Sequence, residues 1–309
     1  MMIQTLNLTK RYGKLVALSN LNLNIGEGEC FGYIGPNGAG KTTTIRILAT
    51  LLQPTWGEAK VCGLTVGYES RKIRPLIGYV PDYFGAYEDM VVQEYLEFFA
   101  SAYHIVGKQR VRVVGDVLEL TDLAHKSDAL VNSLSRGMQQ RLSVARVLLH
   151  DPKVLLLDEP ASGLDPRARI EMRELLKELR RMGKTILISS HILPELADLC
   201  SSVGVLERGE LIFQGSIDEI IRRAKMGTRV EIQVAADAAR AEEVLRGVDG
   251  VREVGTSNGR IVVDLERETH DFSFLAAALL AANVPLRELR EEQVNLETAF
   301  MRLTKGVVQ

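Results

Sequence analysis

Apolar and polar residues alternate through the opening part of the chain, which is typical of strands that bury one face. Ile3 to Leu8 predicts a first strand, and a second alternating run extends from Leu21 to Ile25. Cys30 to Ile34 is instead a continuous apolar run, followed directly by a glycine-rich loop and by helical spacing from Thr42 to Leu52. This part of the chain therefore predicts strands, then a tight loop that leads into a helix.

The middle of the chain changes from a helical pattern to a strand pattern. Residues 92–149 carry apolar residues three and four positions apart, which predicts a mostly helical region. Val154 to Leu157 and Thr185 to Ile188 are short apolar runs, typical of parallel strands that are buried on both faces. Between them, Arg167 to Arg181 predicts an amphipathic helix, so that strand, helix and strand form a right-handed crossover in an α/β sheet. The expected inward positions of that helix are Ile170, Leu175, Leu176 and Leu179.

A smaller α+β domain is predicted from residue 227 onward, where the composition changes. Its pattern reads β-α-β-β-α-β, which is the order of a ferredoxin-like unit. The expected elements are Arg229 to Val234, Ala236 to Leu245, Val251 to Val254, Ile261 to Leu265, Phe272 to Ala282 and Leu286 to Leu289. Leu296 to Leu303 predicts a closing helix. We therefore expect two domains, residues 1–226 and residues 227–309.

Composition argues against nucleic-acid binding and against a membrane-spanning chain. The 309 residues are 46% hydrophobic and 25% charged, as in soluble globular proteins, and the net charge of -2 gives no basic excess. The longest apolar run, Phe274 to Ala282, is nine residues long, whereas a spanning helix needs roughly 20. Cys30, Cys62 and Cys200 have neither metal nor redox spacing, which fits a reducing compartment. We expect a cytoplasmic protein, and work at a membrane would require another chain to cross it.

Gly35 to Thr42 matches the P-loop pattern G-x-x-x-x-G-K-[ST]. Glycines allow the backbone to curl so that successive N–H groups converge on phosphate oxygens, and the following helix adds its positive N-terminus. Lys41 is expected to reach the β- and γ-phosphates, and the Thr42 hydroxyl to bind Mg²⁺. The motif stands between a predicted strand and a predicted helix, which is the context that phosphate binding requires.

The apolar run that ends at Leu157 is followed by Asp158, Glu159 and a proline. A buried strand at this point would deliver Asp158 to the edge of the sheet, where its carboxylate can hold Mg²⁺ through water. Glu159 is then placed to accept a proton from the attacking water. With a P-loop upstream, this pair indicates nucleotide hydrolysis rather than a solvated loop.

Together with four further motifs, these two resemble the ATP-binding subunit of ATP-binding cassette (ABC) transporters over about residues 1–220. Leu134 to Arg141 is similar to the family's signature loop, and Ser162 to Asp165 to the loop that crosses the dimer interface. His191 resembles the switch histidine that contacts the γ-phosphate. Tyr12 stands where the family stacks an aromatic ring on adenine, with ordinary core packing as the alternative.

The resemblance implies a P-loop α/β domain with a mixed sheet core and a helical subdomain at about 92–149. It further implies ATP and Mg²⁺ as ligands, a second copy whose ATP meets the signature loop, and a separate permease at the inner face of the cell membrane. Lys41, Glu159 and His191 would be catalytic. The residues expected to contact ATP are Tyr12, Gly35, Pro36, Asn37, Gly38, Ala39, Gly40, Lys41, Thr42, Thr43, Ser135 and Gly137.

Three positions depart from the family pattern. Arg136 and Met138 stand where the family usually has Gly and Gln, so that a cation is added near the phosphates and an amide is lost. These variants resemble the drug, polysaccharide and sodium exporter branch, which implies export. Asp82 stands where a glutamine is common. Its carboxylate still offers oxygen to Mg²⁺, so we place it with Thr42 and Asp158 as a metal ligand, although it is shorter and charged.

Three functions follow from these motifs. The first is an exporter subunit whose permease docks around Asp82 to Tyr95, where Tyr83, Phe84, Tyr87 and Met90 form an apolar patch or pack in the core. The second is a soluble ABC ATPase that acts on DNA or ribosomes. One P-loop, no sustained heptad run and no basic patch disfavour it. In the third, the C-terminal domain binds a small regulatory ligand.

Overall fold

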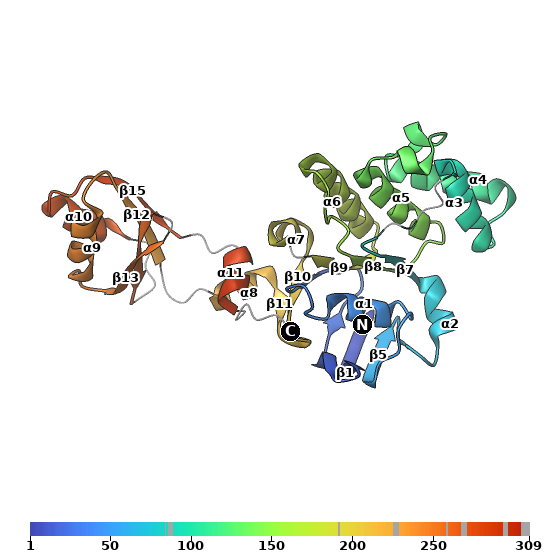
Figure 1. Cartoon of the computed structure of the whole chain (residues 1–309), viewed down its shortest axis with the longest axis horizontal. Helices are drawn as coiled ribbons and strands as arrows, with labels where there is room; N and C mark the ends of the chain where they lie inside the picture. Colours follow the sequence, from blue (N-terminus) through green and yellow to red (C-terminus); the bar gives the residue numbers. More distant parts are fainter. Residues whose placement is uncertain are drawn as a thin grey trace. The chain divides into compact units, whose positions relative to one another are not determined.

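The computed structural model describes residues 1–83, 85, 89–190, 192–224, 229–257, 259–266, 271–292 and 296–303. It divides into two compact units, each described by itself: the larger is Met1–Ile217 together with Leu303, and the smaller is Asp218–Arg302 (Figure 1). The domain boundary predicted between residues 226 and 227 lies outside the described residues.

The larger unit contains a six-stranded sheet in the order β11-β10-β4-β9-β8-β7. The strands from β10 to β7 are parallel to their neighbours, and β11 is antiparallel to β10. Every residue of β4, β8 and β9 is buried, in agreement with their continuous apolar runs. The strands are β4 (Cys30–Ile34), β7 (Ile77–Val80), β8 (Val154–Asp158), β9 (Thr185–Ser190), β10 (Ser202–Glu207) and β11 (Glu210–Ser216).

A second, antiparallel sheet is formed mostly by the N-terminal residues, in the order β2-β1-β5-β6, with β3 paired to β1. The first predicted strand is confirmed but continues to Tyr12. The prediction of one strand from Leu21 to Ile25 is wrong, because β2 ends at Leu21 and β3 begins at Asn24. The strands are β1 (Ile3–Tyr12), β2 (Leu15–Leu21), β3 (Asn24–Ile25), β5 (Trp56–Val61) and β6 (Leu64–Thr65).

Helix α1 (Lys41–Leu48) contributes to a core shared by the two sheets, in which Ile45 and Leu48 are fully buried. The predicted helix end at Leu52 is wrong. Thr50 has a φ of 62°, and an α-helix of L-residues does not continue through a left-handed residue. Figure 1 shows α1 on one side of the six-stranded sheet and α5, α6 and α7 on the other.

The region 92–149 is mostly helical, as predicted. It contains α3 (Val92–Ala102), α4 (Gly107–Leu120) and α5 (Arg136–Leu148). The remaining helices of this unit are α2 (Ser70–Ile73), α6 (Pro166–Arg181) and α7 (Leu193–Leu199). The expectation that Ile170 points inward is wrong, because its side chain is 53% exposed. The buried face of α6 is made by Ala168, Met172, Leu175, Leu176 and Leu179.

The smaller unit has a four-stranded antiparallel sheet in the order β13-β14-β12-β15. One face of this sheet packs against α9 and α10 through a core that includes Val230, Val263, Leu245 and Leu279. The elements are β12 (Arg229–Val234), α9 (Ala238–Arg246), β13 (Val251–Ser257), β14 (Arg260–Leu265), α10 (Ser273–Ala281) and β15 (Leu286–Glu291). Two further helices are α8 (Ile217–Ala224) and α11 (Leu296–Leu303).

Candidate functional site

The glycine-rich loop connects the end of β4 to the first turn of α1. A Cβ on Gly35 would lie 2.4 Å from the backbone oxygen of Leu206, so no side chain fits there. Gly40 has a φ of 108°, which is left-handed, and a Cβ there would lie 2.6 Å from the backbone oxygen of Ala17. These two glycines allow the loop to lie close to neighbouring backbone while it turns into the helix. A helix N-terminus leaves its first N–H groups without intrahelical partners, so the start of α1 can bind an anion.

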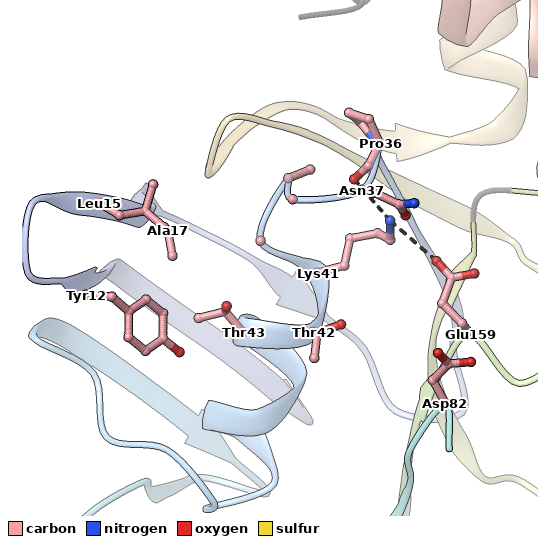
Figure 2. Close-up of a pocket in the computed structure, with 13 residues that line it drawn as sticks. Tyr12, Leu15, Ala17, Pro36, Asn37, Lys41, Thr42, Thr43, Asp82 and Glu159 are labelled. Carbon is pink, nitrogen blue, oxygen red and sulfur yellow. Dashed lines mark hydrogen bonds and ion pairs between the residues drawn. The ribbon is translucent and has the colours of Figure 1, made fainter. Parts of the chain in front are cut away.

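Lys41 is almost fully buried, with 6% of its side chain exposed. Its Nζ donates hydrogen bonds to the backbone oxygens of Gly35 at 2.6 Å and Pro36 at 3.2 Å. The same atom lies 3.4 Å from Oε1 of Glu159. Figure 2 shows Lys41 and Glu159 directed toward one another across the loop. The ammonium group is therefore held at the centre of the glycine-rich loop, beside the proposed catalytic carboxylate.

Asp158 is the last residue of β8 and is 2% exposed. Its Oδ1 accepts a hydrogen bond from Oγ1 of Thr42 at 3.1 Å and another from Oγ of Ser189 at 2.8 Å. Burial raises the pKa of the Asp158 carboxyl, and these two hydrogen bonds oppose that rise because they favour the charged form. The neighbouring carboxylates of Glu159 and Asp82 raise the pKa further.

Ser189 is a site residue that no local sequence motif predicts. Its hydroxyl donates to Asp158 and also accepts the backbone N–H of Glu159 at 3.0 Å. Parallel pairing of β8 with β9 sets Asp158 opposite Ser189. The only sequence signal was that Ser189 lies close to the end of a predicted strand, next to the motif assigned to His191.

Glu159 has a φ of 51°, a left-handed conformation that costs an ordinary residue about 1–2 kcal/mol. Such conformations in non-glycine residues cluster at functional sites. Here the turn directs the side chain toward Lys41 and into the cavity, with 14% of the side chain exposed. The left-handed backbone conformation therefore places the Glu159 carboxylate in the cavity.

A cavity of about 330 Å³ opens beside the loop (Figure 2). Tyr12 and Leu15 line one end of it, Lys41 and Glu159 line the other, and Asp82 also reaches it. Its full lining is Tyr12, Leu15, Ala17, Pro36, Asn37, Gly38, Ala39, Gly40, Lys41, Thr42, Thr43, Asp82 and Glu159. The structure thus brings together most of the predicted ATP contacts, and Tyr12, at 46% exposed, lies at the cavity and not in the core.

Other predicted residues lie elsewhere. Ser135 caps α5, with its Oγ accepting the N–H of Met138 at 3.4 Å, and Gly137 is buried under the same helix start. Neither belongs to the described lining of the cavity. His191 lies outside the described residues, as do Phe84 and Tyr87 of the predicted apolar patch.

The remaining members of that patch behave differently from one another. Tyr83 is 82% exposed and Met90 is partly buried. Tyr95, the last residue of the predicted docking segment but not a member of the patch, is fully buried. Among the described residues, no three His, Cys, Asp or Glu side chains form a metal-binding group. Mg²⁺ is commonly held by one or two carboxylates together with phosphates and water, and the hydroxyl and carboxylate of Thr42 and Asp158 fit that pattern.

Comparison with known proteins places these features in a family. The model of the family described as ABC transporter matches residues 18–162. The chain is 37% identical over 303 residues, 98% of this chain and 97% of the relative, to the Nod factor export ATP-binding protein I of Burkholderia orbicola. The chain belongs to the ATP-binding subunits of ABC transporters. It therefore binds and hydrolyses ATP.

Two further similarities support this membership of the ABC family. Over 305 residues the ABC subunit is 30% identical to the linearmycin resistance ATP-binding protein LnrL of Bacillus subtilis, covering 98% of each chain. A solved dimeric ATP-binding cassette in a post-hydrolysis state, bound to ADP and Pi, has a TM-score of 0.63 at 30% identity. That match covers 70% of this chain and 98% of the cassette. In the part of the chain that the structure describes, no helix is long and apolar enough to cross a membrane.

Proposed function

We propose that this ABC subunit is part of an exporter and that it energises a separate membrane permease through ATP-driven dimerisation of two copies. The observation that supports it most is the convergence of Lys41, Thr42 and Glu159 on one cavity, with Asp158 bonded to Thr42 behind it. The name of one relative refers to export and that of the other to resistance, and neither name refers to DNA or ribosomes.

In this proposal different residues of the cavity bind different parts of ATP. The loop N–H groups and Lys41 bind the phosphates, and Tyr12 stacks on adenine. Lys41 exchanges its bonds to Gly35 and Pro36 for phosphate oxygens, which are stronger partners because they are charged. His191, which follows β9 in the sequence, would contact the γ-phosphate.

Thr42, Asp158 and Asp82 would hold Mg²⁺ next to the phosphates. When bound, the ion neutralises charge on the phosphates and orients them. Burial raises the pKa of the Asp158 carboxyl, and the hydrogen bonds from Ser189 and Thr42 oppose that rise because they favour the charged form. Glu159 would accept the proton of the attacking water, since it lines the cavity beside Lys41.

The partner copy would complete each site. Ser135 and Gly137 stand at the N-terminus of α5 and present its free N–H groups, which favour an anion. We place them on the ATP of the second copy because they do not line this chain's own cavity. The permease would dock near Asp82 and the exposed Tyr83, at the cytoplasmic face of the cell membrane.

We further propose that the smaller unit is a ferredoxin-like accessory domain, residues 227–309, that serves assembly or regulation. The strand order β13-β14-β12-β15 with two helices on one face supports this fold. All of the described residues that line the ATP cavity lie between Tyr12 and Glu159. A small-ligand role for this domain remains the alternative that a ligand screen against the isolated chain would test.

ATP hydrolysis by the purified chain tests the site assignment. Lys41→Ala removes the cation at the centre of the loop, so nucleotide turnover should fall to background. Lys72→Ala is the matched control, because Lys72 is 71% exposed and pairs with Glu69 outside the cavity. ATPase activity of Lys41→Ala close to that of the control would contradict the P-loop assignment.

A further inference from the structure

We propose that Arg136 is a positioning residue that clamps the loop Ser162 to Asp165 against the start of α5. This inference rests on the proposed function, in which the signature loop and the Ser162 to Asp165 loop both act at the ATP-bound dimer interface. The clamp makes these two loops of one subunit move as a unit when the dimer closes.

The guanidinium of Arg136, an exposed side chain, lies next to Gly163 on the side where a side chain at position 163 would project. A Cβ built on Gly163 would lie 2.5 Å from Cζ, 2.5 Å from Nη1 and 2.8 Å from Nη2 of Arg136. Because these three distances are nearly equal, the planar group lies face-on to Gly163. A glycine at position 163 leaves the space that the guanidinium fills.

Gly163 is suited to this contact in a second way. Its φ of 67° is left-handed, which glycine adopts without the steric cost that a side chain would bring. The loop thus turns its bare Cα toward α5. Arginine and glycine at these two positions form a matched pair, because a side chain at 163 would push the guanidinium away.

The helices that carry the two loops are already packed together. A Cβ on Gly137 would lie 2.6 Å from Cβ of Ala168 in α6, so the first turns of α5 and α6 are in close contact. One turn further along, Nη2 of Arg141 lies 3.3 Å from Oε2 of Glu171. Arg136 extends this helix contact to the loop that precedes α6, whose N-cap is Asp165.

A role as a simple cation toward phosphate makes different predictions. An ammonium group would supply the same charge, and a methyl group on Gly163 would be of little consequence. The face-on contact instead requires a planar group, which lysine lacks. Lysine at 136 and alanine at 163 therefore separate the two roles.

The test is a double-mutant cycle on the full-length chain, with kcat and KM for ATP measured for Arg136→Ala, Gly163→Ala and the double variant. We expect each single variant to lower kcat about three- to tenfold, the range of coupled neighbouring residues, with KM near that of the unaltered chain. The kcat of the double variant should lie within about twofold of the kcat of the slower single variant, because either change alone removes the clamp. Arg136→Lys should resemble Arg136→Ala.

Multiplicative effects in the double variant, or full activity of Arg136→Lys, would overturn the clamp. Thermal unfolding of Arg136→Ala and Arg136→Lys separates positioning from folding, since loss of the clamp should change kcat without a matching change in the unfolding midpoint. Gly163→Ala is expected to lower the midpoint by itself, because the φ of Gly163 is left-handed. A drop in kcat that parallels a drop in the unfolding midpoint across the Arg136 variants would also overturn the clamp. If the unaltered chain hydrolysed no ATP, the proposed function would fail together with this role, whereas normal activity with an additive cycle would reject the clamp alone.

Discussion

The carboxylate of Asp158 receives hydrogen bonds from two different elements, Thr42 at the start of α1 and Ser189 in β9. Ser189 also accepts the N–H of Glu159, so one hydroxyl orients both acidic residues. In metal sites, groups that hold the ligands set their orientation and basicity. Ser189 is thus the support for Asp158 and Glu159.

Ser189→Ala should raise the Mg²⁺ concentration that half-saturates ATPase activity by about 10- to 100-fold, as is usual when such a support is lost. Ser190→Ala is the matched control, because Oγ of Ser190 accepts the N–H of Ile192 instead. The measurement is ATP turnover across a Mg²⁺ titration. Equal Mg²⁺ dependence of the two variants would mean that Ser189 does not support Asp158 as the proposed metal ligand.

Site residues could be predicted from the sequence where a single short segment carries both a recognisable pattern and the reactive side chains. The loop from Gly35 to Thr42 and the pair Asp158 and Glu159 were predicted because one short segment carries each motif. Ser189 was not predicted, because its role depends on the register between β8 and β9, which sets it opposite Asp158, 31 residues away in the chain. A local residue pattern does not determine the register between strands that are distant in the sequence.

At the scale of elements, the same limit explains the error at Ile170. The apolar positions of α6 that face the core are spaced by three and four from Ala168 to Leu179, and Ile170 falls off that stripe. From the sequence alone, an apolar residue next to the buried stripe is easily predicted to be buried as well. Which face of the helix is buried is decided by the element that packs against it. The strands β8 and β9 were predicted well because they are buried on both sides.

His150 joins three elements of the larger unit. Its ring stacks on Tyr103, which caps α3, at a centroid distance of 4.2 Å. Its Nε2 lies 2.9 Å from the backbone oxygen of Ile77 at the start of β7, where only the Nε2–H form can donate. Burial lowers the pKa of the His150 imidazole from its usual value, although the bond to Ile77 opposes this.

This lowered pKa predicts a pH effect on stability. Below the unfolded pKa of 6.5, the unfolded state binds more protons at His150 than the folded state does. The contribution of the neutral ring is therefore intact above that pH and is lost as the pH falls toward the folded pKa. His150→Gln can still donate to Ile77 but does not titrate.

We expect the free energy of unfolding to drop more for the unaltered chain than for His150→Gln between about pH 7.5 and about pH 5.5. Denaturant unfolding at the two pH values measures it, and the difference between the two proteins cancels the other titrating groups. An equal drop in both proteins would show that His150 is not the group responsible.

At the scale of the whole molecule, the described cavity is confined to the larger unit, Met1–Ile217. We therefore predict that truncation after Lys225 leaves a chain that still binds ATP, with altered dimerisation or turnover. Nucleotide binding measured by calorimetry tests this, with Lys41→Ala in the truncated chain as the control for specific binding. A folded truncation that binds no ATP would show that the smaller unit completes the site.

The assembly of two copies around ATP is the central claim, and Glu159→Gln tests it most directly. The substitution keeps the shape of the side chain but removes the base, so hydrolysis should fall by roughly 10²- to 10⁴-fold while ATP still binds. Light scattering with ATP and Mg²⁺ should then show a stable dimer for Glu159→Gln and a monomer without nucleotide. Only monomer in the presence of ATP, from a variant that binds ATP normally, would contradict the account.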